Sequence, residues 1–274
     1  MFGGNSSTSK PVFGKVYFDA MKPDCYDSIY ISPHFDDAVC SCGGQIFQQT
    51  QRGENVLVVT VAAGEPQTEI RSPFAEFQHH NWGLDAGEVV ARRRAEDVAA
   101  CQRLGADYLH WSLPDAIYRL HPHHEEPLYT SNESIFGVLH SAEEALEQEL
   151  SLFFSRLPHS RRVAAPLSAG NHVDHQITRA AAERVWGPAL LYYEDFPYVQ
   201  RNPKEVARLV QPAKAWRSYL VTLSHADLLA RLEAMAAYRS QIGSLFNDAG
   251  SMEAAVRSQV ARTGGERLWQ RVGG

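Results

Sequence analysis

Residues 55–63 are the segment that most restricts how this chain can fold, because Asn-Val-Leu-Val-Val-Thr-Val-Ala-Ala is apolar almost without interruption. A strand of this composition has no polar face to turn toward water, so it belongs in a parallel sheet that is covered on both sides. Shorter apolar runs predict further strands at residues 26–32, 107–113, 162–167 and 189–193. Segments typical of helices lie between or after them, at residues 43–52, 86–104, 142–156 and 173–186.

This alternation of strands and helices predicts an α/β fold, with a Rossmann-like parallel sheet and helices on both faces. After residue 198 the pattern changes to mostly helical segments, of which residues 226–242 are the clearest. A chain of 274 residues can form one large domain or two small ones. Because we find no internal repeat and no low-complexity linker, we expect one domain over residues 1–274. Its α/β core spans about residues 20–198, and its helical extension residues 199–274.

Composition excludes several classes of protein. A net charge of −6 and a pI near 6.1 give no electrostatic footprint for nucleic acid. No apolar run approaches the ~20 residues of a membrane helix, and residues 1–10 lack the apolar core of a signal peptide. Four cysteines are too few for a disulfide scaffold, and we expect Cys40 and Cys42 to be buried small hydrophobic residues. The expected location is the cytoplasm.

Side chains that can bind a metal ion or transfer a proton follow the first predicted strand, which stops before Pro33. His34 and Asp37 lie three positions apart, so one turn of helix can aim both at a single ion. Asp36 lies between them and could act on a water bound to that ion. The carboxyl ends of strands are where open α/β sheets bind their ligands. The alternative for such an Asp-Asp pair is an ordinary helix cap.

A second cluster, Asn-His-Val-Asp-His at residues 171–175, follows the fourth predicted strand. It supplies further imidazoles, His172 and His175, and a carboxylate, Asp174. Taken alone, this cluster would usually be an exposed helix start. Because both clusters follow strand ends, we expect them to meet in a single crevice.

The two clusters also carry a family resemblance. Pro-His-Phe-Asp-Asp at residues 33–37 with the glycines at 43–44, and His-Val-Asp-His at residues 172–175, resemble the signature motifs of the LmbE-like or PIG-L family. Weaker similarities lie at residues 93–96 with 104–105, at residues 113–115 and at residues 193–198. The resemblance covers the chain from about residue 26 to residue 198. It implies a zinc-dependent deacetylase of N-acetylglucosaminyl compounds.

The resemblance also implies a role for each residue of the two motifs. The implied metal ligands are His34, Asp37 and His175. Asp36 matches the base that takes a proton from water and later helps to protonate the departing amine. His172 matches the residue that stabilises the tetrahedral oxyanion as an imidazolium or acts as a general acid, and Asp174 could fix its tautomer and raise its pKa. These donors suit Zn²⁺, but would also accept iron(II), cobalt or manganese.

Two further residues match positions that contact substrate sugar in the family, namely Arg93 and Asp115. The alternative for Arg93 is a solvated helix face paired with Glu96, and for Asp115 a turn residue after Pro114. Long polar stretches at residues 64–83 and 114–133 are expected to shape the substrate pocket. We expect their histidines to be exposed or part of a lid rather than a second metal site.

The resulting prediction is a hydrolase that removes an N-acetyl group from a glucosamine-type glycoside, a small amino-sugar substrate. A metal-dependent amidase or O-deacylase for a bulkier acyl group would need a wider pocket around the same residues. A catalytically silent carbohydrate-binding protein would have no need of Asp36. Some family members form homo-oligomers, so self-association is possible here, although no residue allows subunits to be counted.

Overall fold

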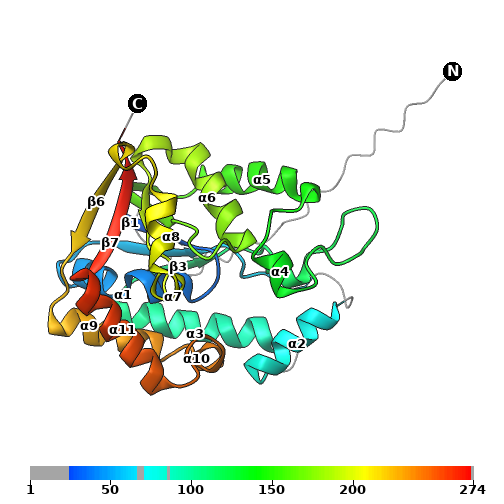
Figure 1. The fold of residues 1–274 in the computed structure, drawn as a ribbon, viewed down its shortest axis with the longest axis horizontal. Helices are drawn as coiled ribbons and strands as arrows, with labels where there is room; N and C mark the ends of the chain where they lie inside the picture. Colours follow the sequence, from blue (N-terminus) through cyan, green and yellow to red (C-terminus); the bar gives the residue numbers. More distant parts are fainter. Residues whose placement is uncertain (1–24, 67–70, 85–86, 273–274) are drawn as a thin grey trace.

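The computed structural model describes residues 25–66, 71–84 and 87–272, and shows a seven-stranded sheet between layers of helices (Figure 1). The strand order is β3-β2-β1-β4-β5-β7-β6. Strands β1 to β5 run parallel, whereas β7 pairs antiparallel with both β5 and β6. The strands are β1 (Cys25–Ser32), β2 (Val56–Thr60), β3 (Asp107–His110), β4 (His159–Pro166), β5 (Leu191–Tyr193), β6 (Trp216–Val221) and β7 (Glu266–Arg271). The α/β fold expected from the sequence is confirmed.

Helices cover both faces of this sheet (Figure 1). The α-helices are α1 (Asp37–Gln51), α2 (Pro73–Trp82), α3 (Val89–Leu104), α4 (Asn132–Ile135), α5 (Glu144–Phe154), α6 (Val173–Trp186), α7 (Tyr198–Arg201), α8 (Pro203–Leu209), α9 (His225–Met235), α10 (Arg239–Phe246) and α11 (Ala249–Thr263). Short 3₁₀ helices are η1 (Ala116–Tyr118), η2 (Ser141–Glu143), η3 (Gly187–Ala189) and η4 (Ala213–Ala215). Within the described ranges, no helix is long and apolar enough to cross a bilayer.

The apolar core has two layers, one on each face of the sheet. Successive residues of a strand point to opposite faces, so Ile29 and Ile31 join the layer under α5 and α6, whereas Tyr30 joins the layer under α1 and α3. All five residues of β2 are buried, as expected for a strand covered on both sides. The layer around Tyr30 also contains residues of α9, α10 and α11. The C-terminal helices therefore complete the core.

The order of the strands locates the crevice. From β1 the chain builds β2 and β3 on one side, and then crosses to place β4 on the other side of β1. The carboxyl ends of β1 and β4 thus lie side by side where the strand order reverses, which is where open α/β sheets bind ligands. Residues 33–37 leave β1 at this point and residues 167–175 leave β4. The two motifs therefore meet as the sequence predicted.

The C-terminal extension differs in part from the expectation of mostly helical segments. It contributes α9, α10 and α11, but also the strands β6, which is mostly exposed, and β7, which is half-buried and rich in charged residues. Neither strand has the long apolar run that revealed β2. The helix expected over residues 226–242 is two helices, because Tyr238 has a non-helical backbone. Its buried hydroxyl donates to Asp97 Oδ1 at 2.7 Å, which fixes the break against α3.

Helix α1 begins at Asp37 rather than at residue 43, so the glycine pair lies inside the helix. A Cβ on Gly43 would lie 3.0 Å from Arg231 Cγ, and a Cβ on Gly44 would lie 2.6 Å from Leu223 Cδ1. The two glycines therefore let α9 and the segment after β6 approach α1 closely. Behind them, Glu266 of β7 accepts the backbone N–H of Gly44 at 2.9 Å and pairs with Arg231 at 3.3 Å.

The cysteines agree with the sequence interpretation. Cys40, Cys42 and Cys101 are buried, and none of the four cysteines forms a disulfide within the part of the chain described. Burial raises the pKa of the Cys40 and Cys42 thiols well above the usual value, as expected of small apolar core residues. The expectation for residues 1–10 lies outside the described residues.

Candidate active site

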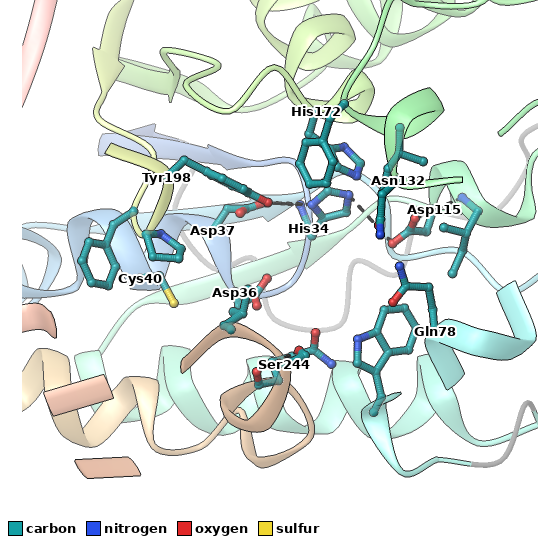
Figure 2. A pocket seen from close by; sticks show the side chains of 18 of the residues that line it. His34, Asp36, Asp37, Cys40, Gln78, Asp115, Asn132, His172, Tyr198 and Ser244 are labelled. Carbon is teal, nitrogen blue, oxygen red and sulfur yellow. Dashed lines mark hydrogen bonds and ion pairs between the residues drawn. The ribbon is translucent and has the colours of Figure 1, made fainter. Parts of the chain in front are cut away.

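A pocket of about 220 Å³ opens at the carboxyl ends of β1 and β4 (Figure 2). The residues after β1 and the start of α6 form its floor. Gln78 and Trp82 of α2 line one wall, and Asp115 and Asn132 line another. Both long polar stretches of the sequence therefore contribute to the pocket, as predicted.

Three side chains at the floor bring their donor atoms together. Asp37 Oδ2 lies 3.0 Å from His34 Nδ1 and 3.2 Å from His175 Nε2. All three residues are buried, and their donor atoms lie within 4.8 Å of one another. Two imidazole nitrogens and one carboxylate oxygen are a donor set typical of a catalytic Zn²⁺ site, which keeps one further position open.

Each imidazole is oriented by a carboxylate on its other nitrogen. Asp174 Oδ2 lies 3.0 Å from His34 Nε2. Asp195 Oδ1 lies 2.7 Å from His175 Nδ1, while its Oδ2 accepts the backbone N–H of Ala169 at 2.9 Å. Such carboxylate partners fix the ring orientation and tautomer of metal-ligating histidines. The remaining nitrogens, His34 Nδ1 and His175 Nε2, are therefore directed at Asp37.

The residues present fit a metal ion. His175 Nε2 is buried and makes no hydrogen bond, although Asp37 Oδ2 is 3.2 Å away, so its lone pair faces the space between the three donors. Among the described residues, one other group, His34, His172 and Asp174, has donor atoms this close. Asp174 already accepts from Arg119 and from the backbone N–H of Ala116. We therefore favour the group that contains Asp37 and His175.

Charges at the floor favour a cation. Burial alone would lower the pKa of His175, but Asp37 and Asp195 outweigh it and raise the pKa to about 9. Burial would likewise lower the pKa of His34, but nearby carboxylates, Asp115 first, hold it well above its usual value. The pKa of Asp37 lies well below its usual value, since the two imidazoles outweigh its burial. A metal that binds here has to displace protons from the imidazoles.

Asp36 lies beside this cluster and is not a helix cap. It occupies the N-cap position of α1 but makes no cap hydrogen bond. Instead, Ser32 Oγ accepts the backbone N–H of Ala38 at 2.9 Å. Figure 2 shows the carboxylate of Asp36 pointing into the pocket, on the side of Ser244. Burial, with the charge of Asp37, raises the pKa of Asp36 to about 6, a value suited to a general base near neutral pH.

His172 begins α6 and lies against His34, with ring centroids 4.7 Å apart. Its Nδ1 accepts the backbone N–H of Asp174 at 3.2 Å, so the neutral ring carries its proton on Nε2. Burial and the charge of His34 hold the pKa of His172 well below its usual value. The tautomer is thus set by the backbone amide of Asp174, whereas the Asp174 carboxylate contacts His34 and Arg119.

Arg119 is a residue that sequence reasoning missed. Its buried guanidinium donates to Asp174 and to Glu143, and Tyr129 donates to Glu143 Oε2 at 2.6 Å. Burial would raise the pKa of Asp174, but Arg119 and His34 outweigh it and lower this pKa far below its usual value. Arg119 therefore holds the carboxylate ionised behind His34. No motif marks an arginine within a polar loop for this position.

Arg93 and Asp115 lie in the pocket wall. The Arg93 side chain is buried, its Nη1 lies 3.6 Å from Asp115 Oδ2, and its guanidinium lies 4.9 Å from the centre of the Trp82 ring. The exposed arginine that pairs with Glu96 is its neighbour Arg92, at 3.6 Å. The alternative of a solvated helix face is therefore wrong for Arg93. Its Nε makes no hydrogen bond and remains a buried donor.

Other pocket residues could not be found from motifs. Phe136, Tyr198, Arg201, Gln241 and Ser244 line the pocket, and most of them come from segments after β5. By contrast, the histidines at residues 121, 123 and 124 pack on one another outside the pocket. Within the described ranges, they do not form a group with donor atoms close enough for one ion.

Comparisons with known proteins find related deacetylases. The model of the PIG-L family, described as GlcNAc-PI de-N-acetylase, matches residues 29–186. The 2′-N-acetylparomamine deacetylase of Niallia circulans is 29% identical over 197 residues, which are 66% of this chain and 71% of that protein. The enzyme of the same name from Streptomyces fradiae is 28% identical over 258 residues, 88% and 80% of the two chains. The crystal structure of the zinc-inhibited form of teicoplanin deacetylase Orf2 superimposes with a TM-score of 0.73 at 28% identity, covering 89% of this chain and 97% of that one.

Proposed function

The chain belongs to the PIG-L family, and we propose that it is a metal-dependent deacetylase. Its reaction is hydrolysis of the N-acetyl group of an N-acetylglucosamine-type glycoside, which releases acetate and a free amine. The observation that carries this proposal is the group of three donors from His34, Asp37 and His175. Beside it lies the carboxylate of Asp36, which makes no helix-cap hydrogen bond. Ligands alone would serve a structural metal, whereas a free carboxylate at the pocket is what hydrolysis needs.

We propose that His34, Asp37 and His175 hold the metal. When bound, a divalent ion polarises the acyl carbonyl and lowers the pKa of water. Asp36 would take the proton of the attacking water and return it to the departing nitrogen. The raised pKa of Asp36 makes it an effective acceptor near neutral pH that can also release the proton. Its place on the pocket side of α1 leaves it free to do both.

His172 would stabilise the negative charge that develops on the acyl oxygen. Because its Nδ1 accepts from the backbone, its Nε2–H is the donor available to substrate. We therefore propose a neutral hydrogen-bond donor rather than an imidazolium in the resting enzyme. Asp174 would act on His34 through its carboxylate and on His172 through its backbone amide.

The sugar would lie against Arg93 and Asp115. These side chains offer a buried, partly unpaired guanidinium and a carboxylate, which suit the hydroxyl groups of a pyranose. The indole of Trp82 beside Arg93 supplies an apolar face. The two curated relatives named above are 2′-N-acetylparomamine deacetylases, and we propose a comparable small N-acetylglucosaminide as substrate.

We propose Zn²⁺ as the metal because the donor set suits it and because a related deacetylase is known in a zinc-inhibited form. Iron(II), cobalt and manganese suit the same donors. A cytoplasmic location and formation of a homo-oligomer remain predictions. A bulkier acyl group stays an alternative substrate, although a pocket of about 220 Å³ is small for one.

Acetate release from 2′-N-acetylparomamine and from simple N-acetylglucosaminides tests this function. We expect the zinc-loaded protein to release acetate and Asp36→Asn to lose activity by about 10²–10⁴-fold, the usual contribution of a general acid–base residue. Both proteins should hold one metal ion, measured by elemental analysis. Glu253→Gln, on the exposed face of α11, is the matched control and should keep full activity.

The alternatives predict different results. Metal bound in the three-donor group without acetate from any glycoside would favour a bulkier amide or an ester. Full activity of Asp36→Asn would remove Asp36 from the reaction. A protein that binds sugars but holds no stoichiometric metal would contradict the proposed function altogether.

A further inference from the structure

Tyr198 is a pocket residue to which no motif assigns a role. It begins α7, after the segment that leaves β5, and lies beyond the region matched by the family model. Figure 2 shows its side chain reaching across the pocket floor, with the hydroxyl end directed toward Asp37 and His34. Its ring lies edge-on to His175, with centroids 5.7 Å apart. The phenol is therefore a neighbour of the proposed metal ligands without being one of them.

Gly170 creates the space that Tyr198 occupies. Its φ of +88° is rarely adopted by other residues, and a Cβ built there would lie 2.6 Å from Tyr198 Cδ1. The loop between β4 and α6 therefore needs a glycine for the tyrosine to reach the floor. Phe136 packs against both His172 and Tyr198, at 5.2 and 6.0 Å between ring centroids. The histidine and the tyrosine thus both pack against one phenylalanine.

The hydroxyl of Tyr198 makes no hydrogen bond to any residue that the structure describes. A donor beside two carboxylates and two imidazoles that is not paired with any of them is available to a ligand in the pocket. A tyrosine hydroxyl ordinarily keeps its proton at neutral pH. The group that reaches the reacting atoms is thus a neutral O–H, a donor of the kind that stabilises oxyanions.

We propose that Tyr198 is a catalytic residue, whose hydroxyl donates a hydrogen bond to the acyl oxygen as the carbon becomes tetrahedral. This proposal rests on the proposed deacetylase function. His172 Nε2–H and Tyr198 O–H then supply two donors to the same oxygen, from α6 and from the start of α7. Because the bond strengthens as charge develops, it accelerates the reaction more than it tightens substrate binding.

Tyr198→Phe tests the proposal, since it removes the hydroxyl and keeps the ring against Gly170 and His175. We expect kcat for acetate release to fall by about 10²–10³-fold, the cost of one oxyanion donor. KM should change by no more than about threefold, as for an interaction made mainly in the transition state. The matched control is Tyr192→Phe, whose hydroxyl donates to Glu183 on the opposite face of the sheet, and it should keep normal kinetics.

Binding measurements separate catalysis from structure. A methylphosphonamidate of the amino sugar mimics the tetrahedral carbon, and Tyr198→Phe should bind it more weakly by about the same factor as the loss in kcat. The affinity for the deacetylated amine and the metal content should be unchanged. Equal weakening of both ligands, loss of metal, or normal kcat would each overturn the proposal while leaving the deacetylase function intact. An inactive wild-type protein would overturn both, and is recognised from the wild-type assay alone.

Discussion

Asp195 tests whether the carboxylates behind the imidazoles support metal binding. Its two oxygens accept from His175 Nδ1 and from the backbone N–H of Ala169. In Asp195→Asn one oxygen becomes an NH₂ group, so one of these contacts is lost together with the negative charge. We expect metal affinity to fall by about 10–100-fold, the usual effect of such a partner. Competition with a chromophoric chelator measures it.

The matched control is Asp248→Asn at the exposed N-cap of α11, where asparagine caps a helix as well as aspartate does. Its metal affinity should equal that of the wild type. An unchanged affinity in Asp195→Asn would contradict the arrangement of His175 described above.

Individual residues also show how far sequence reasoning reaches. His34, Asp36 and Asp37 are neighbours in the chain, so their spacing and the strand before them indicated one shared site, and the family resemblance implied their roles. His175 belongs to a second motif at a second strand end, and the parallel sheet predicts that the two meet. Asp195 lies in the weakly similar segment 193–198, and only the fold shows that it holds His175. Arg119 has a partner 55 positions away and left no signal at all.

Helix α1 offers a prediction about an element, because its glycine lies where α9 and β7 dock. In Gly44→Ala the new methyl group would lie 2.6 Å from Leu223 Cδ1 and 3.0 Å from Glu266 Oε1. Overpacking of this kind costs roughly 1–3 kcal/mol, which outweighs the gain of up to about 1 kcal/mol that alanine brings to a helix. We therefore expect a lower free energy of unfolding, measured by urea titration.

Gly243→Ala is the matched control, since Gly243 lies inside α10 and its Cβ would meet no atom within 4 Å. Here only the helix propensity acts, so stability should stay equal or rise. If both variants changed the free energy of unfolding in the same direction, the close approach at Gly44 would not be the reason for a glycine there.

Strands β6 and β7 show why the sheet could be predicted only in part. β2 is buried on both faces, so its composition is apolar and its place in a parallel sheet follows. β6 is mostly exposed and β7 is half-buried, so tertiary pairing rather than apolar composition makes them strands. Similarly, the break between α9 and α10 depends on a contact between Tyr238 and Asp97, 141 residues apart. Local patterns carry no information about such contacts.

The C-terminal extension is joined to the core so extensively that we propose a single cooperative unit for the whole molecule. β7 pairs with β5 inside the sheet, and β6 continues it beyond β7. Arg231 and Glu266 bind the backbone of α1, while Ser240 donates to Glu96 on α3. Loss of the extension would leave β5 as an open edge and expose the apolar faces of α1 and α3.

Calorimetry of the metal-free protein should therefore show one transition, with equal calorimetric and van't Hoff enthalpies. Removing the metal beforehand avoids the deviation from two-state behaviour that a tightly bound ion introduces. A chain truncated after residue 198 should lack a cooperative transition. Its sheet has lost β6 and β7, and its core has lost the residues of α9, α10 and α11. Two separate transitions in the full chain, or a truncated chain that folds cooperatively, would mean that the extension is a domain of its own. The pocket wall around Gln241 and Ser244 could then move independently of the residues proposed to bind the metal.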